Sequence, residues 1–281
     1  MVENRPFLTI LSHLLLILGL VIIVFPIYLA FVASTWDQAT ALSPPLPLYP
    51  GPYLVDNYST VLFGGAGKGT LNIPMTVALT NSLISALGIA IGKIAISIIA
   101  AFAIVYFRFP FRMTAFWMIF VTLMLPVEVR IVPTYGVVAG LGMIDTYAGL
   151  IIPLIASATA TFLFRQFFLT VPKELVEAAR IDGAGPLRFL WSILLPLSAT
   201  NIAALFVVLF IYGWNQYLWP LLVTKELETI VVGVYRLLAV GDDSIDWPVV
   251  MATAILAMLP PIFVVIAMQR WFVKGLVDSE K

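Results

Sequence analysis

The sequence predicts an all-α polytopic membrane protein with six transmembrane helices. Of the 281 residues, 62% are hydrophobic and only 11% are charged, and the mean hydropathy is +1.06. Because soluble domains carry about a quarter charged residues, several long apolar runs with so few charges favour repeated membrane crossing. The formal net charge of zero gives no sign of nucleic-acid binding, and the absence of cysteine excludes disulfides and thiolate metal sites. The single histidine, His13, cannot alone form a metal site or a catalytic triad, so we expect no enzyme active site.

Six apolar runs predict the spans. The first, 7–33, is longer than the ~7–15-residue apolar region of a secretory signal and lacks an A-x-A cleavage pattern at its end, so we expect a retained helix. The other runs are 77–107, 113–127 with a proline-broken continuation to Pro133, 147–164 with a kink at Pro153, 193–223 and 249–271. Between them we expect a turn-rich loop at 35–74 with a short helix near 54–62, and a polar loop at 225–246.

The distribution of lysine and arginine predicts the orientation. Six spans place both termini on one side of the membrane, together with most of the basic residues: Arg5, Arg108, Arg112, Arg165, Lys173, Arg180, Arg188, Arg270, Lys274 and Lys281. The opposite side receives only Lys68, Arg130, Lys225 and Arg236. By the positive-inside rule, the side with both termini is cytoplasmic.

The second run is rich in small residues and carries one charge. Gly88 and Gly92 form a small-xxx-small pair, which allows close helix packing in lipid, so we expect this helix inside a bundle. Lys93 lies near mid-depth, where a charge usually faces protein or water. Two interpretations stay open: Lys93 belongs to a polar pathway, or it pairs with a neighbouring carbonyl.

The interval between the fourth and fifth runs is the most charged part of the middle of the chain. Pro172 suits the first turn of a helix, 173–181 contains good helix formers, and Gly183 can adopt positive φ and end that helix. Another short helix is expected from about Pro186. One face carries Leu175, Ala178, Ala179 and Asp182, a small and mildly apolar surface that suits a protein groove better than lipid. The alternative is an ordinary solvated amphipathic loop.

The spacing within this interval is specific. Glu177-Ala178-Ala179 is followed by three residues, Gly183, nine residues, Ile193, one residue and Leu195-Pro196. This pattern resembles the coupling-loop signature of binding-protein-dependent ABC importer permeases. The likeness extends from about 77 to 271 and, through 182–184 and 214–221, is strongest to the carbohydrate-uptake branch and its second, maltose-type permease. Segments 3–6, 123–130, 156–166 and 275–281 further resemble permeases of sn-glycerol-3-phosphate importers.

The resemblance implies a type I importer transmembrane fold. It divides the chain into a first helix and long periplasmic loop (1–76), a transmembrane domain (77–273, with the coupling loop at 170–192) and a cytoplasmic tail (274–281). It implies a heterodimer with a sister permease, two copies of a cytoplasmic ATPase and a periplasmic binding protein in the inner membrane, with ATP and Mg²⁺ held by the ATPase. This chain contains no Gly-x-x-x-x-Gly-Lys-[Ser/Thr] phosphate loop. The ATPase contacts implied are Glu177, Ala178, Ala179, Arg180, Asp182 and Gly183.

The implied substrate is sn-glycerol-3-phosphate, with glycerophosphodiesters as further candidates and a neutral sugar as the alternative. A phosphate monoester carries about −1.5 to −2 charges, which arginine can bind bidentately. Arg130 is therefore a candidate contact, although it could instead snorkel to the interface or pair with Glu128 or Glu226. Trp214, Tyr217 and Trp219 could line the path or form an interfacial belt. Asn215 could join helices or face a cavity.

Two other classes of protein remain as alternatives. A secondary transporter needs ion-coupling groups at mid-depth, for which Lys93 is the only strong candidate. A non-transporting scaffold has little use for small-residue packing around a proline-broken span. Recovery with an ATPase, lost on substitution of Glu177 or Gly183, would separate both from an importer permease.

Overall fold

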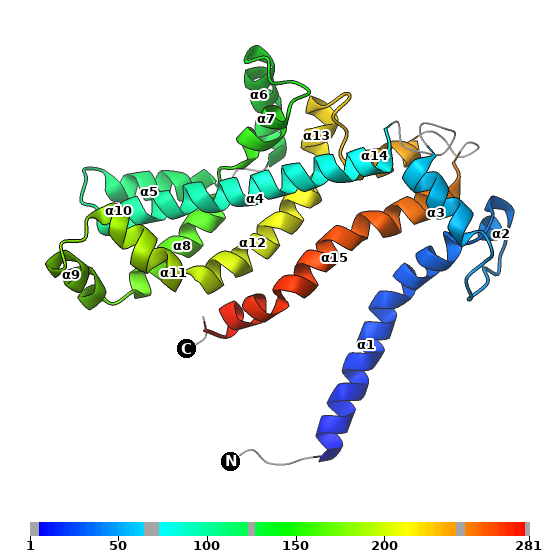
Figure 1. The fold of residues 1–281 in the computed structure, drawn as a ribbon, viewed down its shortest axis with the longest axis horizontal. Helices are drawn as coiled ribbons and strands as arrows, with labels where there is room; N and C mark the ends of the chain where they lie inside the picture. The colour runs from blue at the N-terminus through cyan, green and yellow to red at the C-terminus, as the bar shows by residue number, and fades with distance from the viewer. Residues whose placement is uncertain (1–5, 65–72, 123–126, 240–244, 279–281) are drawn as a thin grey trace. The chain divides into compact units, whose positions relative to one another are not determined.

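The computed structural model describes residues 6–64, 73–122, 127–239 and 245–278, with the side chains of 127–128 and 272–278 outside the described part. Within these ranges every regular element is helical, as predicted (Figure 1). The chain divides into two compact units. One comprises Met1–Val77 and Gly233–Leu259, and the other comprises Ala78–Val232 and Pro260–Lys281.

The first unit contains the first predicted span and the loop that follows it. Its helices are α1 (Pro6–Ala33), α2 (Gln38–Leu42) and α3 (Leu54–Phe63), with parts of α14 (Ile230–Ala239) and α15 (Trp247–Asp278). Helix α1 is long and apolar enough to cross a membrane, and α3 confirms the short helix expected near 54–62. Most large apolar side chains of α1 are exposed, as a lipid-facing helix requires.

Side-chain hydrogen bonds fasten this loop. The Gln38 side chain donates to the Ile245 carbonyl at 2.7 Å and accepts from the Trp247 N–H at 2.8 Å. Asn57 Nδ2 donates to the carbonyls of Ser34 and Trp36, both at 2.9 Å. The loop is therefore joined to the end of α1 and to the start of α15.

The second unit holds most of α4 (Met75–Tyr106) and the helices after it. These are α5 (Arg112–Val121), α6 (Val127–Gly140), α7 (Tyr147–Ile151) with a 3₁₀ turn (Ile152–Leu154), α8 (Ala158–Thr170), α9 (Lys173–Ile181), α10 (Pro186–Phe189) with a π-helical turn (Leu190–Leu194), α11 (Leu195–Leu197), α12 (Ala199–Trp214) and α13 (Leu218–Val223). An apolar core joins α4, α6, α7 and α13 through Ile89, Val138, Leu150, Trp219 and Val223.

Helix α4 packs closely against its neighbours, as its glycines predict. A Cβ atom built on Gly88 would lie 2.6 Å from Ile151 Cδ1, and one on Gly92 would lie 2.5 Å from Ile155 Cγ2. On the facing helix α12, a Cβ on Gly213 would lie 3.0 Å from Ala86 Cα. Small residues on both sides therefore bring α4 against the 151–155 segment and α12.

Three helices have the length and composition of a span: Phe7–Ala33, Met75–Tyr106 and Trp247–Trp271. Two further pairs qualify as bent spans, Tyr147–Leu154 with Ala158–Thr170 at 49° and Pro186–Leu197 with Ala199–Trp214 at 74°. The first bend follows directly after Pro153, where a kink was expected. The described helices thus give three to five candidate spans.

Three sequence expectations are corrected. The run from 113 was expected to extend to 127 and to be broken by proline up to Pro133. Helix α5 ends at Val121, and its 10 residues span only about 15 Å. Helix α6 continues through Pro133 to Gly140 rather than breaking there. The run at 193–223 is divided between α11, α12 and α13, with irregular backbone at 215–217. The loop at 225–246 contains α14, because Ile230 and Val232 bury their side chains fully.

Candidate functional site

The charged interval folds as the sequence predicts. Helix α9 starts directly after Pro172, and Gly183 adopts a φ of 71° at its end. The Gly183 N–H donates to the Arg180 carbonyl at 3.1 Å, and the Ala184 N–H donates to the Ala179 carbonyl at 2.8 Å. This pair of bonds is a Schellman motif, which satisfies carbonyls that the helix end leaves open. After the extended Gly185, Pro186 begins α10.

Most of the predicted coupling residues lie on the accessible side of α9. Glu177, Ala178, Arg180, Asp182 and Gly183 are exposed. Ala179 differs, because only 5% of its surface is exposed and it packs against the chain itself. The expected apolar face of 175, 178, 179 and 182 is therefore split between an inward and an outward side.

Large apolar side chains extend this accessible surface beyond α9. Ile181 is 85% exposed, Leu187 70% and Trp191 69%, although they belong to the most polar interval of the chain. The sequence signal for these residues is a large apolar side chain within a short, otherwise polar helical segment. The sequence alone does not show that such a side chain lies outside the core.

The base of the coupling loop (170–192) is anchored in the core. The Phe189 ring on α10 packs edge-on against the Tyr106 ring at the end of α4, with centroids 5.3 Å apart. The Tyr106 hydroxyl donates to the Phe168 carbonyl on α8 at 3.3 Å. Phe189 and Tyr106 therefore link α10 to the ends of α4 and α8.

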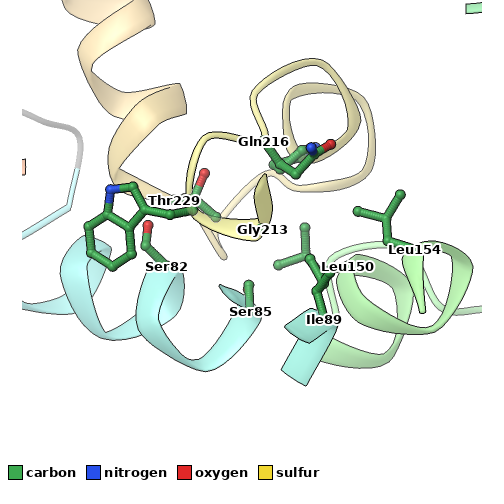
Figure 2. A pocket seen from close by; sticks show the side chains of 10 residues that line it. Ser82, Ser85, Ile89, Leu150, Leu154, Gly213, Gln216 and Thr229 are labelled. Carbon is green, nitrogen blue, oxygen red and sulfur yellow. The ribbon is translucent and has the colours of Figure 1, made fainter. Parts of the chain in front are cut away.

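A small cavity with a mixed polar and apolar lining lies between α4, α7 and α12. Ser82, Ser85 and Ile89 point into it from α4, with Leu150 and Leu154 on one side and Gln216 and Thr229 opposite (Figure 2). Ser85 Oγ and Thr229 Oγ1 are buried without a hydrogen-bond partner in the described structure. The volume is about 10 Å³, near the lower limit for one water molecule and far below a ligand pocket. The cavity therefore cannot hold a substrate molecule.

Lys93 lies one turn of α4 below this cavity. Its side chain is only 7% exposed, and its Nζ sits 4.0 Å from the centroid of the Tyr212 ring on α12. Among the described residues, the partner of Lys93 is therefore an aromatic ring rather than the carbonyl considered from sequence.

The other pathway candidates separate into internal and exposed residues. Trp214 is 3% exposed, lines the cavity and stacks on Phe210. Trp219 is equally buried and donates from Nε1 to the Gly149 carbonyl at 3.1 Å, so neither tryptophan forms an interfacial belt. Asn215 and Tyr217 are exposed. Arg130 is also exposed in the first turns of α6, and the Glu128 side chain lies outside the described part.

Sequence reasoning missed a carboxylate clamp beside this region. Asp145, at a φ of 59°, accepts N–H bonds from Lys225, Glu226 and Leu227 at 2.9 to 3.1 Å on its Oδ1 atom. Burial alone would raise the pKa of the Asp145 carboxyl, but the bonds from Leu227, Lys225 and Glu226 together hold it below its usual value. The clamp fixes the 140–146 turn to the segment that follows α13.

Comparison with known proteins identifies the family. Residues 93–278 match the model of the binding-protein-dependent transport system inner membrane component. The chain belongs to this family. The match covers α9 to α11, which carry the coupling signature, and the C-terminal part of α4, beginning at Lys93. The chain is thus a permease component and an integral membrane protein.

Curated relatives match over the whole length of the permease. It is 62% identical to the sn-glycerol-3-phosphate transport system permease protein UgpE of Brucella melitensis, 60% identical to that of Rhizobium meliloti and 56% identical to that of Escherichia coli O157:H7. In each case 100% of both chains is covered. These relatives are transport subunits rather than enzymes.

A solved structure shares the fold. A chain in the crystal structure of a bacterial ABC transporter involved in the import of the acidic polysaccharide alginate superposes with a TM-score of 0.79. The match covers 97% of the permease and 99% of that chain at 21% identity. The permease therefore has the transmembrane fold of an ABC importer.

Proposed function

We propose that this permease is a transmembrane subunit of an ATP-driven importer that carries sn-glycerol-3-phosphate across the bacterial inner membrane. The observation that supports this most strongly is 56–62% identity over the full length to proteins named as permeases for that substrate. Glycerophosphodiesters, which share the glycerol-phosphate group, are candidate further substrates.

The proposed assembly is a heterodimer with a sister permease, two copies of a cytoplasmic ATPase and a periplasmic binding protein. The chain crosses the membrane six times with both termini in the cytoplasm, so that the coupling loop meets the ATPase. The bias of lysine and arginine toward that side supports this orientation. ATP and Mg²⁺ are bound by the ATPase.

The coupling loop transmits force rather than selecting substrate. Glu177, Ala178, Arg180, Asp182 and Gly183 contact a cleft on the ATPase, and the exposed Ile181, Leu187 and Trp191 widen the contact. Ala179 anchors α9 from within. When ATP closes the ATPase pair, the two coupling loops move together, and the packing of Phe189 on Tyr106 carries this motion into α4. The pore then opens outward and hydrolysis resets it.

The substrate path runs along the polar side of α4. Lys93 and Arg130 attract the phosphate, with Glu128, Asn215, Trp214 and Tyr217 along the same route. The cavity beside Ser85 is too small for the substrate, so the path lies outside it. The sister permease supplies the other half of the path.

A ligand panel tests the substrate. The reconstituted complex should hydrolyse ATP faster when the binding protein is loaded with sn-glycerol-3-phosphate, and less so with a glycerophosphodiester. Stimulation by a neutral sugar alone would favour the carbohydrate alternative within the same family. Uptake that continues without ATP and follows an ion gradient would favour a secondary transporter.

A further inference from the structure

The turn that joins α4 to α5 holds an open surface pocket that neither the coupling loop nor the proposed substrate path uses. Figure 1 shows this turn at the end of α4, where α5 begins. The pocket has a volume of about 430 Å³ and is lined by Arg108, Phe109, Pro110 and Arg112. The Phe109 ring is 40% exposed, so the pocket presents an aromatic surface between two guanidinium groups.

The pocket is positively charged without a counter-ion from the chain around it. The sequence from 57 to 127 contains no aspartate or glutamate, and among the described residues neither arginine of the pocket forms an ion pair. Arg112 Nη1 donates to the Phe107 carbonyl at 3.3 Å, which closes the turn, whereas Arg108 has no such bond within the described structure. Both guanidinium groups therefore keep N–H donors for an external anion.

The pocket lies at the level of the lipid headgroups. Helix α4 has 32 residues and is about 48 Å long, while a bilayer measures about 40–45 Å with its headgroup regions included. Tyr106 is the last residue of α4, and the pocket starts two residues later. Helix α5 continues from the pocket with exposed apolar side chains, Met113 at 41%, Trp117 at 54% and Met118 at 63%. Anion-binding groups thus lie beside a surface that suits acyl chains.

We propose that Arg108 and Arg112 bind the phosphodiester of an anionic phospholipid such as phosphatidylglycerol, with the Phe109 ring against the glycerol backbone of the lipid. Guanidinium groups bind the free oxygens of a phosphate in a bidentate manner. The inference rests on the proposed function only for the leaflet, which is the cytoplasmic one in the proposed orientation. The exposed ring favours a lipid over the soluble ATPase, because aromatic side chains are stabilised among the headgroups.

A photo-crosslinker in the pocket identifies what occupies it. The complete complex with Phe109→p-benzoylphenylalanine is irradiated in vesicles of phosphatidylglycerol and phosphatidylcholine, and the permease is analysed by mass spectrometry. We expect lipid adducts enriched in phosphatidylglycerol above its share of the vesicle. Ile91→p-benzoylphenylalanine, at a 58% exposed position of α4, is the matched control and should give adducts that follow the vesicle composition. Adducts of the Phe109 variant with the ATPase, or without headgroup preference, would overturn the proposal.

Retention of phosphatidylglycerol by the detergent-purified complex tests the role of the charges. Arg108→Gln should lower this retention relative to phosphatidylcholine roughly fivefold, the loss expected for one basic residue near anionic lipid. Arg108→Lys should keep most of the preference because the charge stays. Arg270→Gln removes the same charge from an exposed position of α15 outside the pocket, and should change nothing. An equal loss in Arg270→Gln would show that general positive charge, not the pocket, selects the lipid.

Arg108→Gln is the decisive variant, because Arg108 does not close the turn as Arg112 does. Unchanged retention of phosphatidylglycerol in this variant contradicts the proposal. Displacement of the lipid by millimolar inorganic phosphate would assign the pocket to a soluble phosphate and would also overturn it. Neither measurement uses ATP or transport substrate. A wild-type complex that takes up no sn-glycerol-3-phosphate would therefore contradict the proposed function while leaving the lipid site intact.

Discussion

The Phe189 ring of the coupling loop packs against Tyr106 at the end of α4, with ring centroids 5.3 Å apart. This contact joins a short surface helix to the longest helix in the second unit. Because the Phe189 side chain is only 5% exposed, we expect a push on α10 to reach α4 through this contact.

Removal of this contact should uncouple hydrolysis from transport. Phe189→Ala deletes a buried ring, a change that costs about 3–5 kcal/mol in protein cores. We expect the ATPase still to co-purify through α9, while uptake per ATP hydrolysed falls severalfold. Phe111→Ala, at a ring that is 81% exposed, is the control. Equal uptake per ATP in Phe189→Ala and wild type would show that force does not pass through this contact.

Gly183 should tolerate substitution poorly because of its backbone alone. A Cβ on Gly183 meets nothing within 4 Å, but its φ of 71° costs an L-residue about 1–2 kcal/mol. Gly183→Ala should therefore weaken recovery of the ATPase with the permease by about tenfold. Gly185→Ala is a matched control, because Gly185 has equally open space and a φ of −69°. If both alanines reduced recovery alike, the Schellman end of α9 would not be the cause.

Gly213 should be needed for helix packing in the membrane. A Cβ there would lie 3.0 Å from Ala86 Cα and 3.2 Å from the Ala86 carbonyl oxygen, and backbone cannot move aside easily. Gly213→Ala should lower thermal stability in detergent, with an overpacking cost of about 1–3 kcal/mol. Gly136 lies on the exposed side of α6 and has open space for a Cβ atom, so Gly136→Ala should leave the thermal stability unchanged. A Gly213→Ala protein as stable as wild type would mean that α12 can shift away from α4.

The Asp145 clamp predicts a pH dependence of stability. The bonds from residues 225–227 lower the folded-state pKa of Asp145, so its stabilisation is fully present above the unfolded value of about 3.9 and is lost as pH falls through the lower folded value. Asp145→Asn should be less stable than wild type at pH 6, with a difference that shrinks below about pH 4. Thermal unfolding across pH 3 to 7 measures this, with the exposed Asp56→Asn as control. If the stability difference between wild type and Asp145→Asn stays constant down to pH 3, the hydrogen bonds to the Asp145 carboxylate are not its source.

What the sequence could predict was decided by local signals. Pro172 and Pro186 fix their own φ, and Gly183 reaches positive φ without a steric penalty, so the ends of α9 and the start of α10 could be predicted. The glycines of α4 predicted close packing, because small side chains let helix backbones approach each other closely in lipid. The spacing of the coupling signature predicted the family from the sequence alone.

The errors and omissions concern contacts between distant segments. Asp145 is 82 residues from Leu227, and the pairing of Lys93 with Tyr212 joins α4 to α12, so neither could be read from spacing. The irregular backbone at 215–217 interrupts a run that is apolar on both sides, so the length of the run did not reveal the break. Ser85 and Thr229 are 144 residues apart, and only the fold brings them around one cavity.

ATP-dependent uptake of sn-glycerol-3-phosphate by Glu177→Lys tests the central claim most directly. Glu177 is an exposed carboxylate of the coupling signature, and charge reversal should break its contact with the ATPase without disturbing the core. The account predicts that wild-type uptake requires both ATP and the binding protein, and that the Glu177→Lys complex loses it. Uptake that persists in the variant, or that needs no ATP in the wild type, would contradict a permease driven through its coupling loop.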